Sequence, residues 1–395
     1  MEWKSAIKKD DLIKIPNRWL HLHYYEAFNI LFRFENSLRV FIYAILKNDK
    51  FNDWKTCKFQ VKESQQSISS IAKKRISQAQ TFGYLGYEVK CPIMHLTSGE
   101  LVELMIGDAY WPLFNNYFKG SKEIIKNKLL EIGSIRNSLA HFRPIKKEDV
   151  ELVKQNSRHT LISVEECLRN LFYQRKRVPT NTEAQWYKNI SVLGTDHIST
   201  NLLYSQDEQW INIQLIFKVA VLRKTKYRDD HYGYDVIRLN TPNIVAEYPQ
   251  IGRFVTQISE FVNYPTLNEE YMIDISKEIN LVFKKSVLTE NHEEVTDNLK
   301  TLLSKVTEEH ELLTQDHLAR GQLLEPVSAS AWTQKTNEKL KWVYSYSSLE
   351  CPYDQEDPDE YWGTNYLIHA DIISGVTRYP WMTSDISKFE SLLDL

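Results

Sequence analysis

The chain has 395 residues, of which 42% are hydrophobic and 26% are charged, and its formal net charge is −3. These fractions are typical of globular proteins and exclude a disordered or fibrous chain. The length exceeds a single domain of about 150 residues, so we expect two folded domains.

The charge is distributed unevenly along the chain. Residues 1–180 carry 30 Lys and Arg against 19 Asp and Glu, a net charge of +11. The remaining residues carry 19 against 33, a net charge of −14. A basic N-terminal half suits a phosphate backbone, and an acidic C-terminal half could shield that half or contact a basic partner. Two solvated surfaces of different charge without a functional role remain the alternative.

The first 175 residues are predicted to form an all-α helical bundle. Apolar residues at three- and four-residue spacings from Trp19 to Leu46 predict a long helix. Further helices are expected at about 63–80, after the capping-box spacing of Thr97 and Glu100, from about 121 to near Arg143 ahead of Pro144, and over 148–173.

Glu35 lies where the apolar stripe of the first helix requires an apolar residue. A buried carboxylate needs a partner. Either it pairs with Arg39 one turn later on a partly exposed edge, or it has a functional partner elsewhere.

The polar, basic and proline-containing segment 174–182 predicts a boundary between a domain at 1–175 and a second domain at 181–395. Strict alternation over 211–221 predicts a long β-strand, and Tyr232, Tyr234 and Val236 begin a second one. The charged stretch 224–231 would be the turn of a hairpin. A long helix is expected over about 292–319. The fold class is therefore a multidomain protein, with a helical bundle followed by a mixed α+β domain.

Several classes of protein are excluded by missing motifs. The sequence has no P-loop and no G-x-G-x-x-G, and neither His292 nor His310 begins an H-E-x-x-H zinc motif. The four cysteines are widely separated, so we expect buried thiols, no metal site and no cofactor. The N-terminus lacks the apolar run of a secretory signal, and no uncharged apolar stretch reaches the roughly 18 residues of a membrane span. We expect a cytoplasmic protein with no membrane partner.

The string Arg136-Asn137-Ser138-Leu139-Ala140-His141 combines two residue types suited to phosphodiester chemistry. Arg binds phosphate oxygens in a bidentate manner, and His exchanges protons near neutral pH. Five residues of helix rotate the second side chain to about 140° from the first, so one copy cannot direct both tightly at one point. A two-fold homodimer could complete the site.

This string resembles the R-x-x-x-x-H signature of the HEPN superfamily, and residues 34–39 and 101–111 resemble segments of its abortive-infection-like branch. The resemblance covers about residues 16–175. It implies a dimeric helical bundle and a metal-independent RNA endonuclease, in which Arg136 binds the scissile phosphate, His141 transfers protons and Asn137 supports them. Glu35 resembles an acidic residue of the first helix that faces the motif helix.

The other candidate contacts with RNA are basic side chains, namely Arg39, Lys73, Lys74, Arg75 and Arg143. The role of residues 181–395 is expected to be sensing, restraint or substrate delivery, with a trigger ligand or protein as a possible partner. Such control would suit a toxin-like or phage-defence effector. The alternative is an inactive helical module that binds nucleotide, RNA or protein while the C-terminal half does the work.

Overall fold

The computed structural model describes residues 7–9, 12–14, 22–82, 91–177, 179–263, 275–317, 319–336, 339–345, 347–351, 353–354, 356–364 and 379–381. The chain divides into two compact units, Met1–Arg169 with Leu367–Leu395 and Asn170–Tyr366. We call them the helical unit and the sheet unit. Among the described helices, none is long and apolar enough to cross a membrane.

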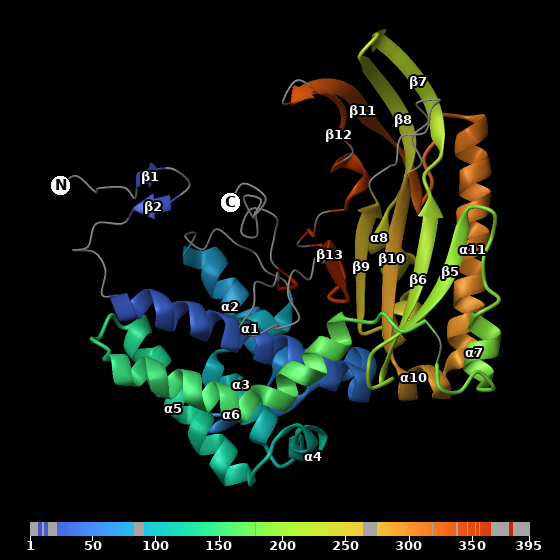
Figure 1. Cartoon of the computed structure of the whole chain (residues 1–395). Helices are drawn as coiled ribbons and strands as arrows, with labels where there is room; N and C mark the ends of the chain where they lie inside the picture. Colours follow the sequence, from blue (N-terminus) through green and yellow to red (C-terminus); the bar gives the residue numbers. More distant parts are fainter. Residues whose placement is uncertain are drawn as a thin grey trace. The chain divides into compact units, whose positions relative to one another are not determined.

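The helical unit is built mainly from α-helices (Figure 1). They are α1 (Leu22–Lys50), α2 (Ile68–Phe82), α3 (Ser98–Ile106), α4 (Trp111–Phe114), α5 (Lys122–Ala140) and α6 (Lys147–Phe172). Short hairpins are formed by β1 (Ile7–Lys9) with β2 (Leu12–Lys14) and by β3 (Lys58–Val61) with β4 (Ser64–Ser67). Short 3-10 turns occupy Phe51–Thr56, Pro92–His95 and Asn115–Tyr117. The α-helical N-terminal region is therefore as the apolar spacing predicts.

Helix α1 is central to the helical unit. Every residue from Val40 to Leu46 is buried, so this part of the helix is covered on all sides. Part of the cover comes from the far end of the chain: the Trp381 ring lies 5.0 Å from the Tyr43 ring, centroid to centroid. The start of the expected helix, residues 19–21, lies outside the described residues.

Two boundaries in the helical unit differ from the expected ones. The helix expected at 63–80 begins only at Ile68, because residues 64–67 pair with 58–61 as a hairpin. The helix expected to end near Arg143 ends at Ala140, so His141 is its C-cap rather than part of its last turn. The capping box of Thr97 and Glu100 is confirmed at the start of α3.

The sheet unit contains two mainly antiparallel sheets and several helices (Figure 1). A five-stranded sheet has the order β13-β9-β10-β6-β5, in which only β13 (Tyr361–Thr364) runs parallel to its neighbour. Its other strands are β9 (Gln257–Asn263), β10 (Ser276–Lys284), β6 (Trp210–Lys218) and β5 (Ile198–Tyr204). A four-stranded sheet has the order β12-β11-β8-β7, made by Lys339–Ser345, Leu324–Thr336, His231–Leu239 and Val221–Arg228.

The helices of the sheet unit are α7 (Gln185–Ile190), α8 (Thr241–Glu247), α9 (Pro249–Phe254), α10 (Lys285–Glu290) and α11 (His292–Gln315), with a 3-10 turn at Ser347–Leu349. The long helix expected at 292–319 is thus present and ends four residues early. It contacts α7, α9, α10 and β11. The mixed α and β character of the C-terminal region is as predicted.

The long strand predicted over 211–221 is confirmed as β6 from Ile211 to Lys218, but its predicted end is wrong. Val219 lies between the strands, and Val221 begins β7, which belongs to the other sheet. Alternation continues across Val219 and Ala220 without a turn residue, so the pattern could not reveal the change of sheet. The hairpin is formed by β7 and β8, and only Asp229 and Asp230 make its turn.

The expected domain boundary also differs from the division in the structure. Lys176 bridges to Tyr204 at the end of β5, which makes the basic segment part of the sheet unit. The closing segment around Tyr379 is grouped with the helical unit, whereas we expected all of 181–395 to form one domain.

Candidate functional site

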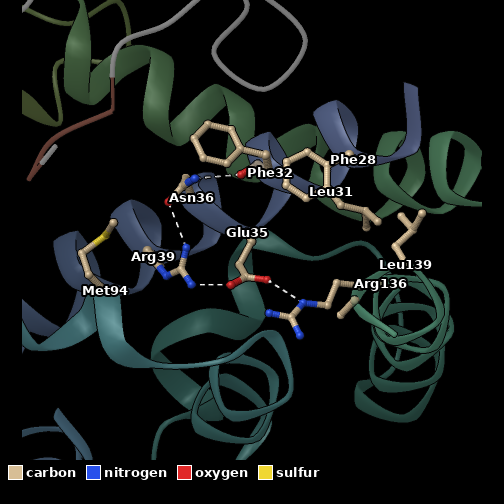
Figure 2. Close-up of a pocket in the computed structure, with 10 residues that line it drawn as sticks. Phe28, Leu31, Phe32, Glu35, Asn36, Arg39, Met94, Arg136 and Leu139 are labelled. Carbon is tan, nitrogen blue, oxygen red and sulfur yellow. Dashed lines mark hydrogen bonds and ion pairs between the residues drawn. The ribbon is translucent and has the colours of Figure 1, made fainter. Parts of the chain in front are cut away.

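A cavity of about 290 Å³ lies in the helical unit, between α1 and α5 (Figure 2). It contains charged groups from both helices and the Asn36 amide, on an otherwise apolar lining. Its lining residues are Phe28, Leu31, Phe32, Glu35, Asn36, Arg39, Met94, Arg136, Leu139 and Ala140. The cavity therefore brings together Glu35 and Arg136, two residues that the sequence selected from segments 101 positions apart.

Glu35 is the buried carboxylate of this cavity, with 9% of its surface exposed. One oxygen accepts a hydrogen bond from Arg39, and the other accepts one from the Ser98 hydroxyl. The second oxygen also lies 3.5 Å from Nε of Arg136. Figure 2 shows the carboxylate between the two guanidinium groups. Glu35 thus pairs within its own helix and also faces the motif helix.

Arg39 is held by several acceptors. Its Nη1 donates to Oδ1 of Asn36 at 2.9 Å, and its Nη2 donates to the carbonyl of Leu96 at 3.0 Å as well as to Glu35. Burial lowers the pKa of the Arg39 guanidinium, and Glu35 opposes that shift. Because these bonds hold the side chain inside the unit, Arg39 positions Glu35 and is poorly placed to contact RNA itself.

Arg136 is the accessible cation of the pair. Its side chain is 35% exposed, and only Nε is directed at Glu35. Its two terminal nitrogens have no hydrogen-bond partner among the described residues, so the planar fork remains able to bind an anion. Two guanidinium groups and one carboxylate leave one excess positive charge at the cavity.

His141 and Asn137 lie outside the cavity. Both side chains are exposed on α5 or at its C-cap. Within the described part of the chain, no hydrogen bond or ion pair joins His141 to Arg136. This separation agrees with the offset expected from helix geometry, in which five residues turn the side chain by about 140° from the first.

The end of α5 has an unusual residue that sequence reasoning missed. The N–H of Arg143 donates to the carbonyl of Ser138 at 2.8 Å, and the N–H of Phe142 donates to that of Leu139 at 3.0 Å. This is a Schellman ending, which normally places Gly in the left-handed conformation. Here Phe142 has φ 54° and its side chain is 88% exposed. The sequence has no Gly between His141 and Pro144, so another residue type must take the left-handed position after the helix.

The Arg143 segment is tied to the first helix, because the Tyr24 hydroxyl donates to the Arg143 carbonyl. The Arg143 side chain itself is exposed. The structure therefore leaves Arg143 accessible beside His141.

The basic triplet on α2 contains two exposed lysines and one ion-paired arginine. Lys73 and Lys74 are exposed, whereas Arg75 forms an ion pair with Glu100 at 2.8 Å. Burial alone would raise the pKa of Glu100, but hydrogen bonds from Arg75 and Thr97 outweigh it and lower the pKa. Arg75 thus joins α2 to α3, and only the two lysines remain open to a ligand.

The sheet unit also contains a buried charged pair, which was not expected from the sequence. Lys277 of β10 and Glu260 of β9 are fully buried, with 2.8 Å between Nζ and Oε2. The ammonium also donates to the carbonyls of Leu239 and Leu349, at 2.8 and 2.9 Å, and lies 3.3 Å from Sγ of Cys351. Burial raises the pKa of the Cys351 thiol. The enclosed, fully bonded ammonium indicates a structural role.

The described residues contain no group of three or more His, Cys, Asp or Glu side chains placed to hold a metal ion. The four cysteines are all buried and free. Comparison of the chain with protein-family models, curated proteins and solved structures finds no match.

Proposed function

We propose that the helical unit is a metal-independent RNA endonuclease whose site is completed by a homodimer. The observation that carries the proposal is the Glu35 carboxylate between Arg39 and Arg136, which joins the first helix to the helix of the R-N-x-x-x-H string. In this proposal Arg136 binds the oxygens of the scissile phosphate, and Glu35 and Arg39 position it. His141 transfers protons and Asn137 supports the pair.

The reaction uses the substrate's own nucleophile. The ribose 2′-hydroxyl loses its proton to water, its oxygen attacks the adjacent phosphorus, and the bond from phosphorus to the 5′-oxygen breaks. The leaving oxygen takes a proton from His141. The products are a 2′,3′-cyclic phosphate and a 5′-hydroxyl, and Arg136 stabilises the charge that develops on the phosphate.

The homodimer explains why Arg136 and His141 are separated in one copy. A two-fold axis places the same patch of both copies face to face, so each copy can supply what the other lacks. Light scattering at working concentration should show two chains per particle. A strictly monomeric particle that cleaves RNA would contradict the composite site.

The enzyme assay compares single-stranded RNA cleavage in excess EDTA by the wild type, Arg136→Ala and His141→Ala. His159→Ala is the matched control, because His159 is an exposed histidine on α6 of the same unit. We expect His141→Ala to lower the rate at least about 100-fold, the usual contribution of a proton-transfer group. Arg136→Ala should lower it by a similar factor through lost stabilisation of charge on the phosphate, and the control should retain the rate. Equal rates for His141→Ala and the wild type, or a requirement for a divalent cation, would overturn the proposal.

A binding module is the second candidate. It is favoured by the exposure of His141 outside the cavity that Arg136 lines. In that case the helical unit binds nucleotide, RNA or protein without cleavage, and the activity of the protein belongs to its C-terminal half. RNA that binds with unchanged affinity to His141→Ala and is cut by neither protein would support this candidate.

We further propose a cytoplasmic toxin-like or phage-defence effector that the sheet unit controls, through restraint or in response to a trigger ligand or protein. The charge split of the two halves supports restraint. Because Trp381 packs on α1, a shortened chain must keep residues 367–395 and replace only 170–366 with a flexible linker. If the sheet unit restrains the nuclease, the shortened chain should cleave RNA faster than the full chain, and His141→Ala should abolish this increase. A shortened chain that folds but does not cleave RNA would contradict restraint.

A further inference from the structure

A row of accessible aromatic rings crosses the four-stranded sheet at the turn of its hairpin. Tyr227 of β7, His231 of β8 and Trp332 of β11 come from three neighbouring strands. The ring centroids are 5.5 Å apart for Tyr227 and His231, and 6.3 Å apart for His231 and Trp332. Tyr227 is 66% exposed, and the other two are half-buried. Figure 1 shows the hairpin of β7 and β8 projecting beyond α11.

The position of Tyr227 is fixed by two local features. Lys226 pairs with Tyr232 and Arg228 pairs with His231, so Tyr227 is the extra residue of a β-bulge. Bulges change the direction of a side chain and are common next to functional sites. The Tyr227 ring lies over Gly233, where a Cβ would come within 2.7 Å of it. The missing side chain of Gly233 lets the ring lie against the sheet, and the opposite side of the ring stays in solvent.

Positive charge accompanies the row. Residues 221–239 contain more Lys and Arg than Asp and Glu, although the half of the chain from residue 181 onward carries 19 against 33. Arg223 and Lys226 are ion-paired with Asp235 and Asp229. Lys224 pairs with Tyr234 and lies over the Tyr232 ring, on the opposite face of the sheet. Arg228 pairs with His231 in the strand register and has no carboxylate partner among the described residues, so it places an exposed cation beside the aromatic rings.

We propose that this surface, the hairpin platform of Tyr227, His231, Trp332 and Arg228, binds single-stranded nucleic acid. Bases would stack on the exposed rings, and a phosphate would pair with the Arg228 guanidinium. A duplex hides the faces of its bases, so it cannot use the rings. A peptide strand that added to β7 would meet a row of charged side chains, which protects sheet edges against such pairing. The platform belongs to the sheet unit, and binding there does not depend on cleavage by the helical unit.

The test measures binding of fluorescent single-stranded oligonucleotides to the full chain carrying His141→Ala, so that no cleavage occurs. Tyr227→Leu and Trp332→Leu should each weaken binding about 5- to 100-fold, the usual effect of losing a stacked base. Tyr227→Phe keeps the ring and should bind within about two-fold of its parent. Tyr187→Leu, a partly exposed tyrosine of α7, is the matched control. Arg228→Gln should reduce the salt dependence of binding, whereas Lys224→Gln, on the opposite face of the sheet, should leave it nearly unchanged.

Two further measurements locate the bound strand and identify its chemistry. Ultraviolet crosslinking followed by peptide mapping should place the oligonucleotide on residues 221–239. An RNA series and a DNA series identify which single strand is preferred. The proposal is overturned if the Leu variants bind like their parent, if crosslinks avoid the hairpin, or if a peptide and not an oligonucleotide protects the β7 amides from exchange. Absence of cleavage by the wild type, with platform binding intact, would refute only the proposed nuclease.

Discussion

Replacing Glu35 with Gln should destabilise the helical unit by about 3 kcal/mol. The substitution keeps the size of the side chain but removes the charge between two guanidinium groups. The Arg39 side chain is only 12% exposed, so its charge would stay buried without a carboxylate partner. Breaking such a pair costs about 3–5 kcal/mol, and we take the lower end because Gln can still accept a hydrogen bond.

Arg136 contributes little to that loss, because its side chain is 35% exposed and water replaces the carboxylate. Glu151→Gln is the matched control: Glu151 pairs with Lys154 at 3.0 Å, but its side chain is 57% exposed. Its removal should cost less than about 0.5 kcal/mol. Urea unfolding followed by helical circular dichroism should therefore show a midpoint lowered by about 1 M for Glu35→Gln and hardly changed for the control.

The double variant Glu35→Gln with Arg39→Met tests the cause. Removing the uncompensated charge should restore part of the lost stability, because no buried guanidinium is left without a carboxylate and the Gln that replaces Glu35 can still accept the hydrogen bond from Ser98. A loss below about 1 kcal/mol for Glu35→Gln, or a double variant no more stable than the single one, would refute the reasoning.

Three other substitutions give independent checks. Phe142→Gly should raise stability by up to about 1 kcal/mol in thermal unfolding, since Gly adopts the left-handed conformation without strain, whereas Phe142→Ala should not. Trp381→Ala should cost about 3–5 kcal/mol in the urea transition of the helical unit, because that ring is 1% exposed; no loss would mean that the C-terminal aromatics do not stabilise α1. Burial and the stacked His197 lower the pKa of His310 from its usual 6.5. The unfolded chain therefore binds the proton more readily, the stability of the sheet unit falls as pH drops below about 6.5, and His310→Gln should flatten that dependence in unfolding measured from about pH 5 to 8.

The amphipathic helices were the most predictable part of the fold. Their apolar spacing and the Thr97 capping box are local signals, and local signals survive in the structure. The sheet unit was harder, because strand pairing joins residues far apart in sequence. Nothing near Val219 indicates that β6 pairs with β10 while β7 pairs with β8 in another sheet.

The site shows the same division between local and distant signals. Glu35 was recognisable because a charge interrupts an apolar stripe, and the Arg136 string because of its two residue types. Ser98 and the Leu96 carbonyl could not be foreseen, since only tertiary packing brings them to α1. Phe142 was missed because its backbone conformation, and not its chemistry, makes it unusual.

The most direct test of the proposed nuclease is end-group analysis of RNA cleaved in excess EDTA, using an oligonucleotide with a 2′-deoxy substitution at single positions. The account predicts products that end in a 2′,3′-cyclic phosphate and a 5′-hydroxyl. It also predicts no cleavage after a substituted nucleotide and none by His141→Ala. Cleavage after a 2′-deoxy nucleotide, or products that carry a 5′-phosphate, would contradict it.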